Sequence, residues 1–326
     1  MTVLRKTLCW LWLLLAIGAA TQHALAAAAF PAKPVRMVIP FAPGGGTDIV
    51  GRIIGQKLTE AWPYPVVVDN RPGAGSTVGT ELVARAVPDG YTIEAVSMSH
   101  ALNVSLYRKL PYHPINDFSP IILIATAPNV LVVHPSLPAK SLKELIALAA
   151  AQPGRLNFSS SGNGGVSHLS AELLRIAAGI NVVHIPYKGA GPAMTALLSG
   201  EVQLMMATAP VALTQMKANK VRALAISSSK RSSLAPELPT IAESGFPGFQ
   251  TDTWYGVLAP ARAPAAVVSR LNADIRRVLE SPAVRTQFEQ QGAHPAGGSP
   301  QEFRGFIQSE IGKWGKAIKA AGVEPI

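Results

Sequence analysis

The chain has 326 residues, of which 48% are apolar and only 15% are charged. These proportions exclude a disordered chain, and the length allows two ordinary domains with a sizeable core. The formal net charge is +10, but the basic residues are spread along the chain and are not interleaved with aromatic residues. This distribution argues against a nucleic-acid-binding groove and favours a surface that attracts small anions.

The first residues have the pattern of a secretory signal peptide. A basic pair at residues 5–6 precedes an apolar run over residues 8–20, and a small-residue cleavage site follows at residues 24–26. The run is shorter than the roughly 20 residues that a membrane-spanning helix needs. We therefore expect residues 1–26 to be removed, together with Cys9, the one cysteine of the chain. An exported chain without disulfides or an anchor fits the bacterial periplasm.

From residue 35 on, apolar runs alternate with glycine-rich loops and helical stretches. The apolar runs predict strands over residues 35–41, 66–70 and 92–97. Apolar residues at helical spacing follow the first glycine loop, and Pro63 ends that helix. Because strands alternate with helices, we expect a parallel sheet with right-handed crossovers.

The second half repeats this alternation. Ser141 and Glu144 form a capping-box pattern at the start of a helix. Strand, loop and helix follow one another over residues 155–179 and again over residues 181–200. Two more strands flank a short helix near residues 210–217. The chain ends in helices that we predict over residues 264–280, 282–290 and 300–320. These last helices have no strands of their own, so we expect them to pack back onto the first lobe.

This order predicts two α/β lobes. The first lobe comprises residues 27–126 and 252–326, and the second comprises residues 127–251. Two crossing strands near residues 124–128 and 250–256 join them. The cleft between the lobes is the expected ligand site, because it lies at the carboxyl ends of the parallel strands.

The loop after the first strand is the first candidate site, and it comprises Pro43, Gly44, Gly45, Gly46, Thr47 and Asp48. It is not a phosphate-binding P-loop, because no lysine follows the glycines. It is not a dinucleotide fingerprint either, because Ile49 stands where the third glycine would be. Two interpretations stay open: backbone amides at a helix start that bind an anion, or glycines that serve a tight turn.

A second candidate loop spans residues 159–170 and offers hydroxyl and amide groups to a ligand. Its candidate residues are Ser160, Ser161, Gly162, Asn163 and His168. The alternative function is a secreted α/β hydrolase-like enzyme that uses a serine and the histidine of this loop. The G-x-S-x-G motif is absent, and Ser167 and His168 are neighbours that point about 100° apart on a helix. We therefore predict no catalytic residue.

Metal and cofactor sites are not indicated. The histidines at positions 100, 113, 134, 168, 184 and 294 show none of the spacings of a metal site. The S-x-x-K match at residues 227–230 lacks its supporting motifs and is interpreted as a solvated loop. We expect neither a metal nor a cofactor.

Several motifs in the same order give a resemblance that covers residues 31–320. They include "KPVRMVIPFAPGGGTDIVGRIIGQKL", "VVVDNRPGAGSTVGTELVARAVPDGYT", "LPYHPINDFSPI", "YKGAGPAMTALLSGEV", "VRALAISSSKR", "LPTIAESGFPGF" and "WYGVLAP". The chain resembles the Bug family, the extracytoplasmic substrate-binding receptors of tripartite tricarboxylate transporters. The resemblance implies a type II periplasmic-binding-protein fold, a monomer that closes on a small organic carboxylate, and a membrane permease as its partner.

The resemblance also implies that the two candidate loops hold the ligand from opposite sides, partly through water. We add Ser76, Asn129 and Ala207 to the expected ligand-binding residues. Family members often carry an aspartate where this chain has Ala207, so an ammonium group would find no partner there. Asp48 and Asp252 are the remaining candidates for that role. The expected ligand is a carboxylate with a neutral body, followed by dicarboxylates and then amino acids.

Overall fold

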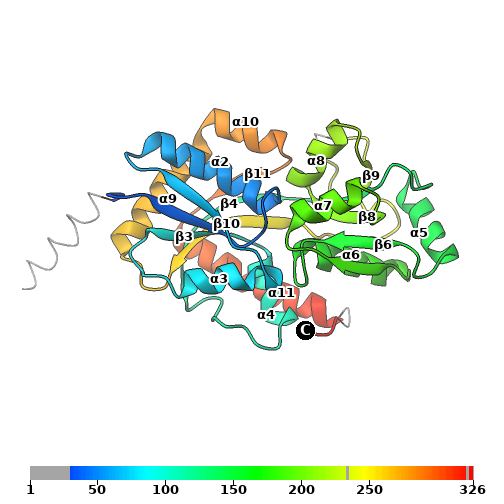
Figure 1. Cartoon of the computed structure of the whole chain (residues 1–326), viewed down its shortest axis with the longest axis horizontal. Coiled ribbons are helices and arrows are strands. Elements are labelled where there is room, and N and C mark those ends of the chain that lie inside the picture. The colour runs from blue at the N-terminus through cyan, green and yellow to red at the C-terminus, as the bar shows by residue number, and fades with distance from the viewer. Residues whose placement is uncertain (1–29, 233–234, 321–322, 326) are drawn as a thin grey trace, which may run out of the picture.

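The structure is a computed structural model that describes residues 30–232, 235–320 and 323–325. The predicted signal peptide lies outside these residues. Two separate sheets form two lobes that lie side by side along the long axis of the molecule (Figure 1). We term them the first lobe, which contains the six-stranded sheet, and the second lobe, which contains the five-stranded sheet. The two-lobed α/β fold is therefore confirmed, and the residue boundaries proposed for the lobes stay a prediction.

The first sheet has the strand order β11-β4-β10-β3-β1-β2. Its strands are β1 (Val35–Ile39), β2 (Val66–Asn70), β3 (Thr92–Ser97), β4 (Phe118–Ala127), β10 (Thr253–Pro260) and β11 (His294–Gly297). β1 is parallel to β2 and β3, but β10 is antiparallel to β3 and β4, and β11 is antiparallel to β4. The expected parallel pairing thus holds only for β1 to β3, because β10 returns from the second lobe in the opposite direction.

The second sheet has the order β7-β6-β8-β5-β9. Its strands are β5 (Asn129–Val133), β6 (Asn157–Ser160), β7 (Val183–Pro186), β8 (Leu204–Thr208) and β9 (Arg222–Ile226). β6 is parallel to β7 and β8, whereas β5 is antiparallel to β8 and β9. β5 is the exception because it carries the chain into the second lobe directly from β4.

The two connections between the lobes lie side by side. β4 ends at Ala127, which pairs with Thr253 at the start of β10. Asn129, the first residue of β5, donates its backbone N–H to the Ser227 hydroxyl beyond β9 at 2.8 Å, and its carbonyl oxygen accepts from the Ser227 N–H at 2.8 Å. The predicted crossings near residues 124–128 and 250–256 are confirmed, and they form a narrow connection about which the lobes can rotate.

Helices cover the first sheet on both faces: α2 (Gly46–Ala61), α3 (Thr77–Ala84), α4 (Ser99–Leu106), α9 (Ala265–Glu280), α10 (Pro282–Gln290) and α11 (Pro300–Ala320). Val50, Ile54 and Leu58 of α2 are buried at helical spacing, and each such side chain contributes about 1.5–3 kcal/mol. The Trp62 indole donates to Asp274 of α9 at 2.8 Å. The C-terminal helices therefore pack onto the first lobe, as predicted (Figure 1).

The expectation that the C-terminal region has no strand was wrong. β11 lies between α10 and α11 and pairs with β4 at the edge of the sheet. Its sequence, His-Pro-Ala-Gly, contains no β-branched residue and no alternation of apolar and polar residues, so its pairing depends on tertiary context.

The second lobe carries α5 (Leu142–Ala151), α6 (Val166–Ala178), α7 (Ala190–Leu198) and α8 (Ala209–Lys217). The Ser141 hydroxyl accepts from the Glu144 backbone N–H at 3.2 Å, which confirms the predicted cap of α5, whereas the Glu144 carboxylate accepts from the Lys140 N–H at 2.7 Å and not from that of Ser141. Among the described residues, none of the helices combines the length and apolar character that a membrane span requires.

Candidate ligand-binding site

A narrow cavity of about 30 Å³ lies where the two lobes meet. Within the described chain, its lining contains no charged side chain. Hydroxyl groups from both lobes and the starts of several helices surround it instead. We term it the inner cavity.

Five helices begin at the inner cavity. The lining residues at or next to these starts are Gly45, Gly46 and Thr47 (α2), Ser99 (α4), Val166 and Ser167 (α6), Ala190 (α7) and Thr208 (α8). No side chain caps any of these five helix starts. The first N–H groups of a helix lack partners within the helix, and the helix dipole places partial positive charge there. The arrangement favours an anion without any cationic side chain.

Hydroxyl groups form the wall between the helix starts. Within the described structure, the hydroxyls of Ser99, Thr208, Thr253 and Tyr255 are buried and make no well-aligned hydrogen bond, although Thr208 and Thr253 lie close to the Tyr255 hydroxyl. Burial raises the pKa of Tyr255, so its phenol stays protonated and can donate. A Cβ added to Gly46 would overlap the Tyr255 hydroxyl, which explains why glycine opens α2. Unpartnered buried hydroxyls are costly, and a polar ligand group would satisfy them.

Asp48 fixes the first-lobe loop but faces away from the cavity. Its carboxylate accepts from the backbone N–H of Gly44 at 3.0 Å, from Arg52 at 2.9 Å and from Asn70 at 2.9 Å. Burial alone would raise the pKa of Asp48, but the hydrogen bonds from Arg52, Gly44 and Asn70 outweigh it and lower the pKa below 3.8. This carboxylate is fully used within its own lobe, so it is not free to bind a ligand ammonium.

The second-lobe loop is held by neutral groups. Ser161 and Ser167 share a hydrogen bond at 2.9 Å, and the Ser167 hydroxyl also accepts from the Ser161 backbone N–H at 2.8 Å. Behind them the rings of His168 and His184 stack with centroids 4.1 Å apart. Burial, and then the neighbouring His168, lower the pKa of His184 to about 3, so both rings are neutral at pH 7.

A serine of this loop does meet a histidine, which lies on β7, but not in a catalytic arrangement. Ser160 lies within hydrogen-bonding distance of His184 Nε2. Ser160 is fully buried and does not line the inner cavity, so a substrate there could not reach its hydroxyl. A nucleophile must contact its substrate, and this pair is instead a structural support for the loop.

A larger pocket of about 380 Å³ adjoins the inner cavity and shares Phe41 and Ser161 with it. We term it the outer pocket. Tyr107, Tyr187 and Lys188 contribute to its lining, and among the described lining residues Lys188 alone carries a charge. The Lys188 side chain is exposed. The inner cavity has room for a group of only a few atoms, whereas the outer pocket has room for a larger one.

The structure brings part of the predicted site together. Gly45, Gly46, Thr47 and Ser161 line the inner cavity, and Ser76, Ser161, Gly162 and Asn163 line the outer pocket. Pro43 and Gly44 border a separate groove beside α7 and α8. The two glycine-containing loops therefore do face each other across the space between the lobes.

Other candidates lie away from the inner cavity and the outer pocket: Asp48, Asn129, Ser160, His168 and Ala207. Asn129 donates its side-chain amide to Ser170 at 3.2 Å, at the connection between the lobes. Ala207 is fully buried in the core of the second lobe, opposite Val130 on β5. Their side chains serve the scaffold that supports the loops.

Sequence reasoning missed several lining residues, among them Ser97, Ser99, Thr208 and Tyr255. Ser97 is the last residue of β3 and Ser99 follows it, so the rule that ligands bind at the carboxyl ends of such strands could have identified both residues. Thr208 is one residue beyond Ala207, and alternate residues of a strand face opposite sides. Tyr255 lies on a crossing strand, where the sequence carries no signal for side-chain direction.

Two α/β lobes, a narrow double connection and a polar cavity between the lobes define a solute-binding receptor of the periplasmic-binding-protein type. Comparison with known proteins specifies the family. The chain belongs to the tripartite tricarboxylate transporter family of receptors, whose pattern it matches over residues 50–323. The resemblance found in the sequence motifs is thereby confirmed.

Individual relatives are similar over nearly their whole length. BugT of Bordetella pertussis is 39% identical over 297 residues, which cover 90% of this chain and 91% of BugT. The structure of R. palustris Rpa4515 with adipate is 37% identical, with a TM-score of 0.89, and covers 91% of this chain and 100% of Rpa4515. The structure of MatC from Rhodopseudomonas palustris with bound malate is 34% identical, with a TM-score of 0.85, and covers 89% of this chain and 100% of MatC.

Proposed function

We propose that this protein is a receptor, without enzymatic activity, that binds a small organic carboxylate between its lobes. The five helix starts at an inner cavity without charged side chains carry this proposal. Backbone amides and hydroxyls bind a carboxylate well, whereas a cation or an ammonium would lack a charge partner there. The carboxylate ligands of Rpa4515 and MatC support the same class of ligand.

The arrangement of the two spaces suggests how the ligand lies. One carboxylate would enter the inner cavity, and the body of the ligand would occupy the outer pocket beside Lys188. A second carboxylate could then pair with the Lys188 ammonium. For this reason we rank dicarboxylates above carboxylates with a neutral body, which reverses the ranking expected from Ala207 alone. Amino acids remain last.

We also propose that the receptor acts in the periplasm and delivers its ligand to a membrane permease. The signal-peptide pattern of residues 1–26 supports this location, and the family's name supports a transporter as the partner. N-terminal sequencing of the protein recovered from the periplasm should find a start between residues 25 and 30. Recovery of the intact N-terminus would contradict export by cleavage.

Calorimetric titration tests the ligand class. We would titrate adipate, malate, benzoate, glutamate and the neutral diamide of adipate into the same preparation. Measurable binding of an acid together with no binding of the diamide is expected, because the helix starts attract charge. Equal binding of adipate and its diamide, or a preference for glutamate over all other acids, would overturn the proposal.

A further inference from the structure

Two of the contacts between the lobes lie beside the outer pocket, which Tyr107, Asn163 and Lys188 of these contacts line. In contact A, the backbone N–H of Ala42 in the first lobe donates to the Lys188 carbonyl oxygen in the second lobe, at 3.1 Å. In contact B, the Tyr107 hydroxyl of the first lobe donates to the Asn163 carbonyl oxygen, at 3.2 Å. Each contact joins the two lobes, so neither can persist when the lobes move apart.

Glycines allow the backbones to approach at both contacts. A Cβ on Gly191 would overlap the carbonyl oxygen of Pro43, and a Cβ on Gly75 would overlap the carbonyl oxygen of Asn163. In each pair the glycine and the carbonyl belong to different lobes. A larger residue at either position would therefore hold the two backbones apart.

Gly191 is not explained by the lobe that contains it. It is the second residue of α7, and its φ lies outside the left-handed region. Alanine is a better helix former than glycine, so α7 itself would favour alanine. The three heavy atoms nearest to an added Cβ belong to Pro43 and Gly44 of the first lobe. The need for glycine comes from the opposite lobe.

We propose that Gly191 is a closure residue, which admits the Pro43 backbone at contact A and so lets the lobes enclose the ligand. Gly191 does not line the inner cavity, so it acts on affinity through the closed arrangement and not through contact with the carboxylate. The inference rests on the proposed function for the identity of the ligand, but the lobe contact itself is independent of it.

Gly191→Ala tests the proposal, with Gly305→Ala as the matched control. Gly305 lies on the exposed face of α11, and no atom lies within 4 Å of its added Cβ. Both variants should melt at or above the temperature of the natural protein, because both place alanine in a helix. In calorimetric titration with adipate, Gly191→Ala should bind about tenfold more weakly or worse, which corresponds to about 1.4 kcal/mol or more. Gly305→Ala should bind within a factor of two.

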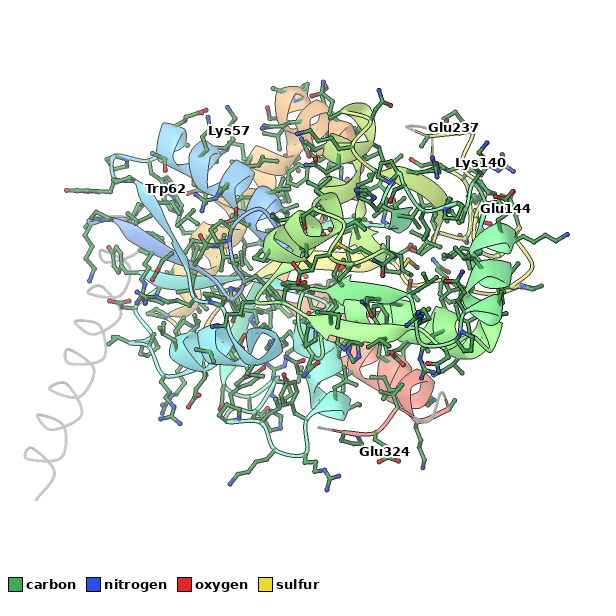
Figure 2. All side chains as sticks on the ribbon, turned by 45° about the vertical axis from the view of Figure 1, so that its right-hand side comes forward. Lys57, Trp62, Lys140, Glu144, Glu237 and Glu324 are labelled. Atoms are coloured by element: carbon green, nitrogen blue, oxygen red, sulfur yellow. The ribbon has the colours of Figure 1, made fainter. Side chains whose placement is uncertain are left out.

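A distance measurement makes the test independent of the ligand. Spin labels would be attached at Lys57→Cys on α2 and Lys140→Cys before α5, in a Cys9→Ser background. These two residues lie on different lobes (Figure 2). The shortest distance between the labels corresponds to closed lobes. Without ligand, fewer labelled molecules should show this distance in Gly191→Ala than in the natural sequence or in Gly305→Ala.

The outcomes separate the two proposals. If no carboxylate binds the natural protein, the proposed function fails, yet a longer label distance in Gly191→Ala still supports the closure residue. If Gly191→Ala matches the natural protein in label distance, and in adipate affinity where adipate binds, then Gly191 has no role in closure.

Discussion

The loops before α2 and α6 present the same feature to the cavity, an uncapped helix start, but different chemistry holds them in place. In the first lobe, the buried Asp48 carboxylate pairs with Arg52, so charge fixes the loop. In the second lobe, Ser161 and Ser167 bond to each other in front of the neutral ring of His184. The comparison shows that the charge beside the inner cavity, on Asp48 and Arg52, belongs to the scaffold, whereas helix dipoles from both lobes face the cavity.

The two arrangements respond to acid in different ranges. The pKa of His184 falls from 6.5 in the unfolded chain to about 3 in the fold, so stability is lost as the pH falls from about 6.5 toward 3. The pKa of Asp48 is lowered below 3.8, so its contribution is complete above that pH and is lost only in stronger acid. The second-lobe loop should therefore weaken first.

The largest expected effect concerns the charged support of the first loop. Asp48→Ala removes the buried carboxylate that accepts from the Gly44 N–H, the Asn70 amide and Arg52, and it should lower the free energy of unfolding by about 3 kcal/mol. Glu60→Ala is the control, because Glu60 lies on the same helix and pairs with Lys57 at the surface. Urea denaturation should show a small effect for the control. Equal effects would mean that the Asp48 cluster is no more than a surface ion pair.

The next effect concerns the helix start that faces the cavity. Gly46→Ala places a Cβ against the Tyr255 hydroxyl and should weaken adipate binding about a hundredfold, or about 2.7 kcal/mol. Calorimetry would measure the affinity, and the melting temperature would report any loss of folding. Unchanged affinity in a folded variant would assign the glycines to a tight turn.

A smaller effect should come from the imidazoles behind the second loop. Between pH 7 and pH 5, the natural protein should lose about 1 kcal/mol more stability than His184→Phe, after allowance for the partial exposure of His184. Burial raises the pKa of Glu94 to about 8, so this residue gains stability for the fold as the pH falls, opposite to His184. Glu94 is present in both proteins, so its contribution cancels when the stability curve of His184→Phe is subtracted from that of the natural protein. Urea denaturation at several pH values measures both curves. Parallel curves would show that His184 titrates normally in the fold.

The smallest effect concerns Lys188 at the outer pocket. Because its side chain is exposed, an ion pair with a second carboxylate should contribute only about 0.2–1 kcal/mol. Lys188→Met should therefore weaken adipate binding by up to about fivefold and leave benzoate binding unchanged. The adipate effect should shrink in high salt. A loss of the same size for both acids would remove Lys188 from the recognition of a second charge.

Much of the fold could be predicted because local signals and tertiary structure agree. α10 begins and ends at the predicted residues 282 and 290, where Pro282 supplies a helix start. β4 was recognised only at its crossing end, since Pro120 and a continuous apolar run give no alternation. β11 has no local signal, because its pairing with β4 is decided at long range.

The site was predictable at the level of loops and less so at the level of side chains. Glycines before a helix mark the loop that contains Gly45 and Gly46, and both line the inner cavity. The roles of Asp48 and His168 depend on partners elsewhere in the chain, such as Asn70 and His184, which no local pattern reveals. A polar residue in a predicted binding loop can equally be the loop's own support.

The central position of β10 has a consequence for folding. β10 lies between β3 and β4, so the first sheet cannot be completed until a strand near residue 260 has joined it. The strands of the second sheet all lie in one continuous stretch before that point. Because closing a shorter loop costs less entropy, we expect amides of β6 and β8 to gain protection before those of β3 and β4 when the chain refolds. With this order of folding, the second lobe serves as the folded link that brings the two parts of the first sheet together. Pulse-labelled hydrogen exchange that found the reverse order would contradict this expectation.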